Sequence, residues 1–339
     1  MSVYNNVREL PAALDSLASQ TFPDYEVVAV NDGSTDGSGE LLDRWAMKDA
    51  RVRVIHQQNS GLGPALRRGC AEARGTFLAR QDADDVSAPT RLERQVEYLE
   101  RNPDIVLCGT WTWFVSPVRG AVSASEVPDD HDSLIAYLEA GDNPFVHGSV
   151  MMRGSRYREE GVGYRLRRYC EEYDLWLRLA SHGRLGMVET PEYLYRLSPG
   201  GMSFGNMQSR IALRDLCLKL HAERKTHGRE VTDWRSAEMR LLAVPSNHGA
   251  SVPREAAAAY ADGLQRLDAG DWRGYIESMR AARKGKGRLG NFAFVHVYLG
   301  MAWPATRWLY RRRVGGTSRR YLRPLRPETS LPDYARGMI

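Results

Sequence analysis

The segment with the clearest chemical potential is a run of acidic residues, Asp82-Ala-Asp-Asp, that follows a short apolar stretch. In extended backbone, Asp82 and Asp84 point to the same side and could together hold one hard divalent cation. A cation there would bridge diphosphate oxygens and neutralise a leaving group. The alternative is a solvated acidic loop or helix cap ahead of Ser87, which is the more common meaning of such a tetrapeptide taken alone.

Asp32 is a second acidic residue at the end of an apolar run. It follows Tyr25-Glu-Val-Val-Ala-Val, and its carboxylate could accept a hydrogen bond from a uracil-type imide or a ribose hydroxyl. Taken alone, Asn31-Asp-Gly-Ser is ordinary turn chemistry. Together with the acidic run it predicts a single pocket, in which the carboxylates of residues 32, 82 and 84 surround one cation and its diphosphate-bearing ligand.

Apolar runs and amphipathic stretches alternate around these acids. Short β-branched runs predict strands, and apolar residues at helical spacing predict helices between them. This alternation predicts a mainly parallel sheet with helices on both faces. In such sheets ligands bind beyond the carboxyl ends of the strands, which is where both acidic segments fall. The predicted strands are 25–30, 52–55 and 75–79, the predicted helices are 7–19, 39–47 and 61–74, and a further apolar segment lies at 106–115.

The composition is typical of a folded protein. The 339 residues are 42% hydrophobic, which allows a full core, and the length predicts about two domains or one large one. The net charge of +5 is uneven, with arginines gathered near the end. No zinc-finger spacing or RNA-recognition signature accompanies them, so nucleic acid is not expected as a partner. The four cysteines form no C-x-x-C pair, which disfavours zinc and disulfides and favours a reducing cytoplasm.

The chain beyond Met207 is expected to be helical. Its uncharged run at 289–306 contains Asn, His, Gly and Pro residues, so it is a poor membrane-spanning helix. Trp303, Trp308 and Tyr310, beside Arg311–Arg313, could instead lie at the inner face of the plasma membrane. A buried helix with a solvated basic end is the alternative that hydropathy favours.

Taken together, these segments resemble glycosyltransferase family 2, the large inverting group with the GT-A fold. The resemblance covers roughly residues 1–205 and implies an α/β fold with a mainly parallel sheet flanked by helices, followed by a helical C-terminal extension. Its motifs occur in the family's order: Ser2-Val-Tyr-Asn, Ser16-Leu-Ala-Ser-Gln-Thr-Phe, Val30-Asn-Asp-Gly-Ser-Thr-Asp, Gly61-Leu-Gly-Pro-Ala-Leu, Ala79-Arg-Gln-Asp-Ala-Asp-Asp, Asn143-Pro-Phe-Val-His-Gly-Ser-Val-Met and Tyr173-Asp-Leu-Trp-Leu-Arg-Leu.

By this resemblance, residues 1–115 form the nucleotide-sugar-binding half of the GT-A domain, 116–205 the acceptor-binding half, and 206–339 a helical C-terminal region. The implied reaction moves a sugar from a nucleotide-diphosphate donor, a UDP-sugar by default, to an acceptor hydroxyl. The acceptor would be a saccharide or a lipid-linked molecule in cell-surface polysaccharide or glycolipid synthesis. The implied cofactor is Mn²⁺ or Mg²⁺.

The family's donor-site residues carry over onto matching positions. Tyr4 would line the nucleotide site, and Asp32 would contact the base. Asp82 would face the donor sugar and ribose, and Asp84 would ligate the metal together with Asp82. These four residues define the predicted donor site.

Two positions in the predicted phosphate and metal surroundings depart from the family pattern. The arginine that many relatives carry after Gly-Leu-Ser-x-Ala is Leu66 here, so contact with the diphosphate would fall to Arg67, Arg68 or Arg80. The alternative for each of these arginines is a solvated charge without a role in binding. Downstream, Ser198 replaces a histidine that could have been a metal or phosphate ligand.

The catalytic base is expected in Cys170-Glu-Glu-Tyr-Asp, just before a Leu-rich helix. An in-line displacement at the anomeric carbon needs a carboxylate that deprotonates the acceptor hydroxyl. Glu172 stands where the family has an aspartate, and Glu171 and Asp174 are alternatives. Acidic residues also favour a helix N-terminus for electrostatic reasons alone. His147 is a candidate acceptor-site residue, with a structural histidine as the equal alternative.

The family opens with an apolar strand ahead of its Ser-Val-Tyr-Asn, so we expect Met1 to be an internal methionine and the true start to lie upstream. The rival function is a catalytically silent nucleotide-sugar-binding or scaffold protein, suggested by the short first strand, Glu172 and Ser198. A sugar-nucleotide pyrophosphorylase and a dehydrogenase are disfavoured, because the sequence has neither of their glycine-rich loops.

Overall fold

The computed structural model describes residues 1–116, 120–159, 161–196, 207–243, 322–324 and 334. The chain forms two compact units. The first comprises Met1–Leu197, Leu213–Trp234 and Thr317–Ile339, and the second comprises Ser198–Ala212 and Arg235–Gly316. Both sheets belong to the first unit. Residues 303–313, for which membrane contact is predicted, lie outside the described residues.

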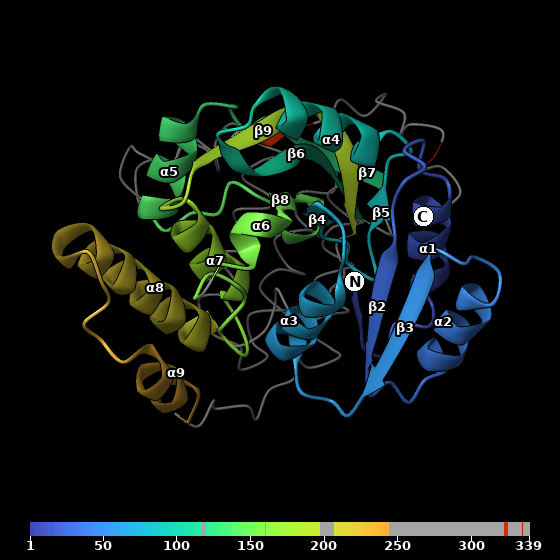
Figure 1. Cartoon of the computed structure of the whole chain (residues 1–339), viewed down its shortest axis with the longest axis horizontal. Coiled ribbons are helices and arrows are strands. Elements are labelled where there is room, and N and C mark those ends of the chain that lie inside the picture. The colour runs from blue at the N-terminus through green and yellow to red at the C-terminus, as the bar shows by residue number, and fades with distance from the viewer. Residues whose placement is uncertain (117–119, 160, 197–206, 244–321, 325–333, 335–339) are drawn as a thin grey trace, which may run out of the picture. The chain divides into compact units, whose positions relative to one another are not determined.

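The first sheet has three parallel strands in the order β1-β2-β3 (Figure 1). β1 spans Ser2–Val3, β2 spans Val27–Asp32 and β3 spans Val52–Gln57. All six residues of β2 are buried, as expected for a strand covered on both faces. The predicted strands are confirmed, but Asn31 and Asp32 belong to β2 rather than to a turn. Their side chains find hydrogen-bond partners on β3, which extends the pairing.

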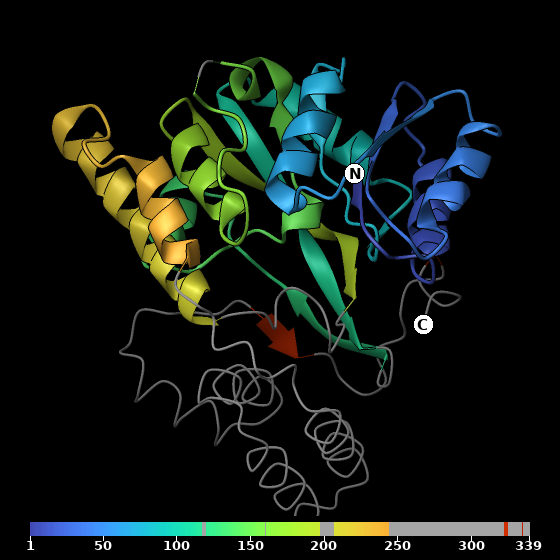
Figure 2. The same ribbon diagram turned by 90° about the horizontal axis from the view of Figure 1, so that it is seen from below.

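Three helices flank this sheet, and they confirm the helices predicted from the apolar spacing. α1 (Leu10–Ala18) and α2 (Ser38–Ala46) lie on one side, and α3 (Leu62–Glu72) lies on the other (Figures 1 and 2). α3 begins very close to the segment that precedes the later helix α7. A Cβ atom on Gly63 would lie 2.0 Å from the carbonyl oxygen of Leu166, so only glycine fits at this position.

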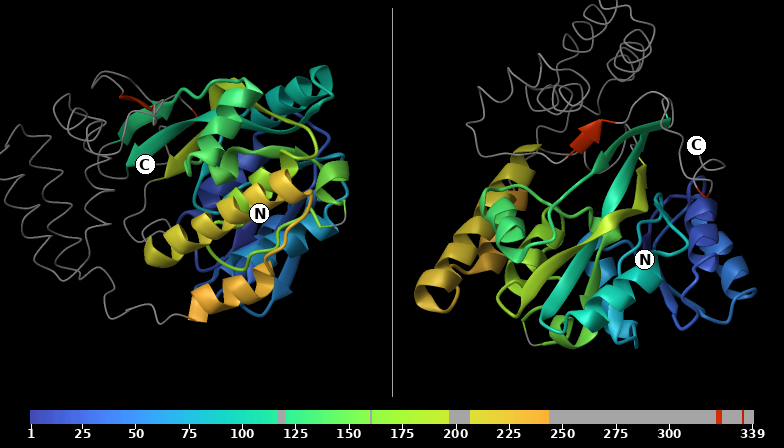
Figure 3. Two further views of the ribbon diagram at one scale, coloured as in Figure 1. Left: turned by 90° about the vertical axis from the view of Figure 1, so that its left-hand side faces the viewer. Right: turned by 90° about the horizontal axis from the view of Figure 1, so that it is seen from above.

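The second sheet is mixed. Its two longest strands, β6 (Ile105–Ser116) and β9 (Arg184–Arg196), run parallel and side by side (Figure 3). The other pairings in this sheet are antiparallel. The prediction of a mainly parallel sheet therefore holds for the first sheet. In the second sheet it holds only for the pair β6 and β9. The remaining strands are β4 (Phe77–Ala79), β5 (Val86–Ser87), β7 (Gly120–Ser125), β8 (Met151–Arg153) and β10 (Leu322–Pro324).

A bridge between Ser2 and Asp82 joins β1 to the chain that leaves β4. On its other side, Ser2 pairs with Val30 and Val3 pairs with Asn31 of β2. The carboxyl end of β1 therefore lies between the end of β2 and Asp82. This edge is the place where the predicted acidic residues fall.

Helices cover both faces of the second sheet. α4 (Arg91–Arg101) packs on one face of β6, and α7 (Glu171–Leu179) packs on the opposite face (Figure 1). The other helices are α5 (His131–Glu139), α6 (Gly154–Tyr157), α8 (Met207–His227), α9 (Trp234–Ala243) and a 3-10 helix at His147–Ser149. α8 and α9 have residues in both units, and β10 is a strand within the region predicted to be helical. In the part of the chain that the structure describes, no helix is both long and apolar enough to cross a membrane.

Candidate active site

Residues 82–85 form an acidic loop that follows β4 and precedes β5. Burial, and then the charges of Asp84 and Asp82, raise the pKa of Asp85 well above its ordinary value. Burial and the charge of Asp82 raise the pKa of Asp84 to about 6. Burial also opposes the ionisation of Asp82, but the charge of Arg80 holds its pKa below the ordinary value. The loop therefore contains carboxylates that repel one another, and a bound cation would relieve that repulsion.

Arg80 supplies positive charge to this loop from a buried position. Its side chain is 4% exposed, and its Nη2 atom lies 2.5 Å from Oδ1 of Asp82 in a salt bridge. Its Nη1 atom donates to the carbonyl oxygen of Gln81. Because the guanidinium is committed to Asp82, the diphosphate contact predicted for Arg80 would have to be shared with that carboxylate.

Aromatic and imidazole groups adjoin the acidic loop. Nε2 of His147 lies 2.7 Å from the hydroxyl of Tyr164, and the hydroxyl of Tyr193 accepts a hydrogen bond of 3.2 Å from the backbone N–H of Asp82. A Cβ atom on Gly148 would lie 1.9 Å from the Tyr193 hydroxyl, so glycine is required beside His147. Burial, followed by a nearby arginine charge, lowers the pKa of His147 to about 3. The imidazole is therefore neutral at physiological pH, with one ring nitrogen able to donate and the other able to accept.

Asp32 lies at the end of β2 with only 2% of its surface exposed. Its carboxylate accepts hydrogen bonds from Nε2 of Gln57 (2.7 Å), from the backbone N–H groups of Ser60 (2.9 Å) and Gly61 (2.9 Å), and from the Ser60 hydroxyl (3.1 Å). A carboxylate has about four acceptor positions, so the chain itself uses them. The predicted contact with a nucleotide base would require one of the side-chain donors to move.

Asp32 and Asp82 share an edge of the fold but do not surround one ion. β1 lies between them, and two strand spacings amount to roughly 10 Å. Oxygen atoms that share a cation each lie about 2.0–2.6 Å from it. Asp32 is therefore too far from Asp82 to share one cation with it, but a ligand as long as a nucleotide diphosphate could reach both ends, and the contact of Asp32 with the base stays a prediction. Tyr4 directly follows β1 and is 51% exposed, which suits a ring that lines such a site.

Asp174, one of the three candidate bases, is held in a buried ion-pair network. It is 1% exposed, and its carboxylate forms salt bridges with Arg165 at 2.7 Å and with Arg178 at 2.8 Å. Burial alone would raise the pKa of Asp174, but the charges of Arg178 and Arg165 hold it below the ordinary value. A carboxylate with two committed partners and a lowered pKa is a weak base. The geometry therefore favours the neighbouring glutamates over Asp174.

Glu171 and Glu172 form the first turn of α7. Glu171 is 4% exposed, whereas Glu172 is partly exposed. After burial, the charge of Glu172 is among those that raise the pKa of the Tyr164 hydroxyl, which itself contacts His147. Among the three candidates, Glu172 is the one whose side chain is partly exposed and therefore open to an acceptor.

The backbone just before α7 is strained. Tyr169 and Cys170 have φ angles of 59° and 52°, although neither is glycine. Left-handed conformations at such residues cost of order 1–3 kcal/mol each and persist where the surroundings impose them. They place the first turn of α7, with its glutamates, against the segment that contains Tyr164.

Relatives of this sequence are glycosyltransferases. The sequence model of glycosyl transferase family 2 matches residues 1–161. EpsE of Bacillus subtilis (strain 168), assigned as a glycosyltransferase, is 32% identical over 232 residues, which are 66% of this chain and 81% of that protein. The amylovoran biosynthesis glycosyltransferase AmsE of Erwinia amylovora is 32% identical over 203 residues, which are 59% of this chain and 75% of that protein.

This chain belongs to glycosyltransferase family 2.

Solved glycosyltransferases share the fold of this family member. S. aureus TarS 1-349, in complex with UDP-GlcNAc, matches with a TM-score of 0.52 and 18% identity over 84% of this chain and 90% of that chain. The mannosyltransferase PcManGT from Pyrobaculum calidifontis, in complex with GDP-Man and Mn²⁺, matches with a TM-score of 0.51 and 16% identity over 92% of this chain and 82% of that one. The predicted GT-A type α/β fold is confirmed.

The acidic loop of this glycosyltransferase suits a hard divalent cation bound by few protein ligands. Within the described residues, no group of three or more His, Cys, Asp and Glu side chains is arranged to hold a metal. The protein would supply Asp82 and Asp84, and the remaining ligands would come from phosphate oxygens and water, as is usual for Mg²⁺.

Two residues that contact the acidic loop, and one that supports them, were not predicted as site residues from the sequence. Arg196 donates from its backbone N–H to Oδ1 of Asp85 at 2.8 Å, and from Nε to the carbonyl oxygen of Asp84 at 3.1 Å. Gln81 contacts the loop directly, and Arg91 supports Gln81 from α4. The sequence signal for Arg196 was its place in Tyr195-Arg-Leu-Ser, where the family often has Tyr-Arg-x-His.

The two arginines of α3 that are predicted to contact the diphosphate take no part in the hydrogen bonds described for the acidic loop. Arg67 and Arg68 are exposed, and Arg68 pairs with Glu72 one turn later at 3.1 Å. Their contact with a diphosphate stays a prediction, and so does the acceptor role of His147.

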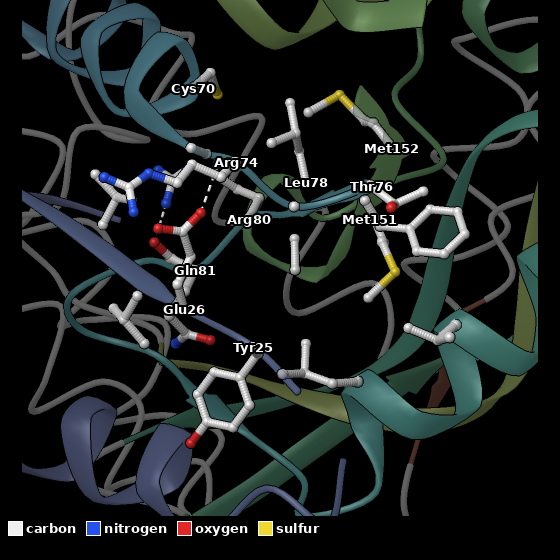
Figure 4. A pocket seen from close by; sticks show the side chains of 18 of the residues that line it. Tyr25, Glu26, Cys70, Arg74, Thr76, Leu78, Arg80, Gln81, Met151 and Met152 are labelled. Atoms are coloured by element: carbon white, nitrogen blue, oxygen red, sulfur yellow. Dashed lines mark hydrogen bonds between the residues drawn. The ribbon is translucent and has the colours of Figure 1, made fainter. Parts of the chain in front are cut away.

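A cavity of about 950 Å³ lies beside strands β2 and β4 (Figure 4). It is lined by Val27 and Val28 of β2, by Phe77–Ala79 of β4, and by apolar side chains such as Met151 and Met152. Arg80 and Gln81 border it, but none of the four aspartates at residues 32, 82, 84 and 85 does. The cavity therefore does not coincide with the predicted donor and metal residues.

The raised pKa of Asp84 predicts a pH-dependent response to Mn²⁺. In the folded, cation-free protein the pKa of the Asp84 carboxyl is about 6, compared with its ordinary value of 3.8. The protonated carboxyl therefore stabilises the folded state at low pH, and this stability is lost as the pH rises through 6. Mn²⁺ binds the ionised carboxylate. We therefore expect the Mn²⁺-induced increase in melting temperature to be small at pH 5 and to grow through pH 6 toward pH 7.5. The variant Asp84→Asn should show no such rise, and a pH-independent response in the wild type would contradict the assignment.

Removing the Asp174 carboxylate is expected to lower the stability of the fold, because this side chain has a structural role. Asp174→Ala would remove the carboxylate partner of the buried Arg178 and leave Arg165 paired with Glu230 only, and breaking such a buried ion pair typically lowers the free energy of unfolding by about 3–5 kcal/mol. Urea unfolding measures this loss. Asp132→Ala, on the exposed side of α5, is the matched control and should change it by no more than about 0.5 kcal/mol.

Proposed function

We propose that this family 2 glycosyltransferase moves a sugar, with inversion, from a nucleotide-diphosphate sugar to a hydroxyl group of a saccharide or lipid-linked acceptor. The observation that carries the proposal is the acidic loop, in which burial and the charge of Asp82 raise the pKa of Asp84 to about 6. Crowded carboxylates at a strand end are suited to Mn²⁺ or Mg²⁺. When bound, such an ion neutralises the diphosphate leaving group.

The side chains around the loop have separate tasks in this proposal. Arg80 keeps Asp82 ionised through their salt bridge. Glu172 accepts the proton of the acceptor hydroxyl as the hydroxyl oxygen attacks the anomeric carbon. The new bond to that carbon forms as its bond to the phosphate oxygen breaks, and the nucleoside diphosphate leaves. Because attack and departure occur on opposite faces, the anomeric configuration inverts, while the neutral His147 orients the acceptor hydroxyl.

The relatives support the choice of donor and setting. One solved relative is in complex with UDP-GlcNAc and the other with GDP-Man and Mn²⁺, so a nucleotide sugar is the common feature. A UDP-sugar is our default donor. AmsE is named for amylovoran biosynthesis, which supports cell-surface polysaccharide or glycolipid synthesis as the setting. The proposed cytoplasmic location and the membrane contact through residues 303–313 rest on the sequence alone.

A donor screen by thermal shift, with and without Mn²⁺, tests the proposal. A ligand that binds only the folded state stabilises it by about 2.7 kcal/mol at a concentration of 100 times its Kd. We expect one nucleotide sugar to raise the melting temperature in the presence of Mn²⁺ and much less in its absence. If no nucleotide sugar shifts the melting temperature under either condition, the proposal fails.

A catalytically silent binding protein is the second candidate, because Glu172 and Ser198 replace the family's aspartate and histidine. This candidate predicts donor binding without turnover. Release of nucleoside diphosphate from the donor that binds, in the presence of a saccharide acceptor panel, separates the two functions. Release that disappears in Asp84→Asn excludes the silent reading.

A further inference from the structure

A buried arginine lies beneath the acidic loop. Arg91, the first residue of α4, is 0% exposed and has no carboxylate partner among the described residues. Burying a charge is unfavourable unless its hydrogen-bonding groups are satisfied. An arginine has five N–H donors, and those of Arg91 all find neutral acceptors. These are Oε1 of Gln95 (3.0 Å), Oε1 of Gln81 (3.1 Å), Oγ of Ser87 (2.9 Å) and the carbonyl oxygens of Arg80 (2.6 Å) and Val150 (3.2 Å).

Gln81 connects this arginine to the acidic loop. Its side chain is 4% exposed, and Oε1 accepts hydrogen bonds from Arg91 and from the hydroxyl of Ser87 at 2.6 Å. Its Nε2 atom donates to the carbonyl oxygens of Asp82 and Asp85, each at 3.0 Å. One amide group therefore spans the loop from its first residue to its last. Residues 83–85 lie in neither a helix nor a strand. The two hydrogen bonds from Gln81 are therefore important for holding the turn in its shape.

We propose that Gln81 is a positioning residue for cation binding: anchored by Arg91, it fixes the acidic loop so that the carboxylates of Asp82 and Asp84 face one cation. The proposal rests on the metal site of the proposed function. Functional groups must be held to within about 0.5 Å of their working geometry. Groups that hold metal ligands in place typically change metal affinity by 10–100-fold when they are removed.

The fold offers a matched control for Gln81. Gln95, also on α4, is 0% exposed and accepts a hydrogen bond from the same arginine. Its Nε2 atom likewise donates to two carbonyl oxygens, those of Cys108 (3.3 Å) and Ser149 (3.0 Å). Neither belongs to the acidic loop. The two glutamines therefore have the same chemistry and burial but hold different parts of the backbone.

The experiment compares Gln81→Leu with Gln95→Leu. Each variant removes one acceptor of Arg91 and two donors to carbonyl oxygens, without adding charge. We measure the melting temperature of the cation-free protein and the Kd for Mn²⁺ by titration calorimetry at pH 7.5. Both variants should lower the melting temperature, but only Gln81→Leu should raise the Kd for Mn²⁺, by at least about tenfold.

The outcomes separate this proposal from the proposed function. A wild-type protein that binds no Mn²⁺ overturns the metal site itself and the role of Gln81 with it. Wild-type binding together with a Gln81→Leu Kd within twofold of wild type, or with an equal increase in Gln95→Leu, overturns only the positioning role. If either leucine variant fails to fold, Ser87→Ala replaces the pair. It removes the 2.6 Å bond that orients Gln81, and an unchanged Kd in that variant also overturns the proposal.

Discussion

Replacing Asp84 with asparagine is expected to slow sugar transfer by about a hundred- to a thousandfold while making the cation-free protein more stable at pH 7.5. The rate falls because the cation that neutralises the leaving group loses a ligand, and a lost electrostatic contact of this kind costs that order in kcat. The stability rises because burial and the charge of Asp82 raise the pKa of Asp84 to about 6, so its ionised form is disfavoured in the folded state. Nucleoside diphosphate release and the melting temperature without metal measure the two effects.

Asp15→Asn is the control for this substitution. Asp15 is exposed on α1, so its replacement should leave both the rate and the melting temperature near their wild-type values. An Asp84→Asn variant with an unchanged kcat would show that the acidic loop does not hold a catalytic cation. A variant that lost both activity and stability would contradict the predicted opposition of the two effects.

Glu172→Gln is expected to lower kcat by about a hundred- to ten-thousandfold with little change in the KM for the donor. A general base contributes about this much to a reaction, and an amide cannot accept the proton. The predicted donor contacts, such as Tyr4, Asp32 and Asp82, do not include Glu172, so donor binding should survive. The partly exposed side chain also suggests that the melting temperature will change little. Steady-state kinetics with varied donor and saturating acceptor provide the measurement.

A series of substitutions along α7 distinguishes the three candidate bases. Glu171→Gln changes a residue that is 4% exposed, and Asp174→Asn disturbs the ion pairs with Arg165 and Arg178, so both should affect the melting temperature. Only Glu172→Gln should lower kcat without lowering the melting temperature. If Glu171→Gln shows the larger kcat loss at an unchanged melting temperature, Glu171 is the base instead.

At Asp84, activity and stability are expected to change in opposite directions. The reason is the same as at many active sites, where groups suited to the reaction are costly to bury.

The elements of the first sheet could be predicted because their signals are local. The β-branched run at 25–30 and the apolar spacing at 7–19 decide strand and helix with little help from distant residues. The mixed second sheet could not be predicted in this way. β6 pairs with β9, about eighty residues later in the chain, and no local pattern encodes such a pairing.

The candidate site was predictable in its residue types but not in its supporting contacts. The acidic run at residues 82–85 was visible in the sequence, and together with Asp32 at a second strand end it indicated a ligand site. Arg91 and Gln81 gave no such signal, since polar residues at the start of a helix or the end of a strand are usually solvated. In the folded chain both side chains are buried, and buried donors and acceptors must find hydrogen-bond partners. Gln81 therefore bonds to the backbone of the acidic loop, and Arg91 bonds to Gln81.

The sequence by itself determined the family, the order of strands and helices in the first sheet, and the set of carboxylates from which a cation site and a base could be chosen. The partners of these carboxylates could be seen only in the folded chain. There β1 lies between Asp32 and Asp82, Asp174 is paired with two arginines, and Glu172 is partly exposed. The physical reason is that residue type sets what a side chain can do, whereas burial and the charges of distant partners set its pKa and its free hydrogen-bonding capacity.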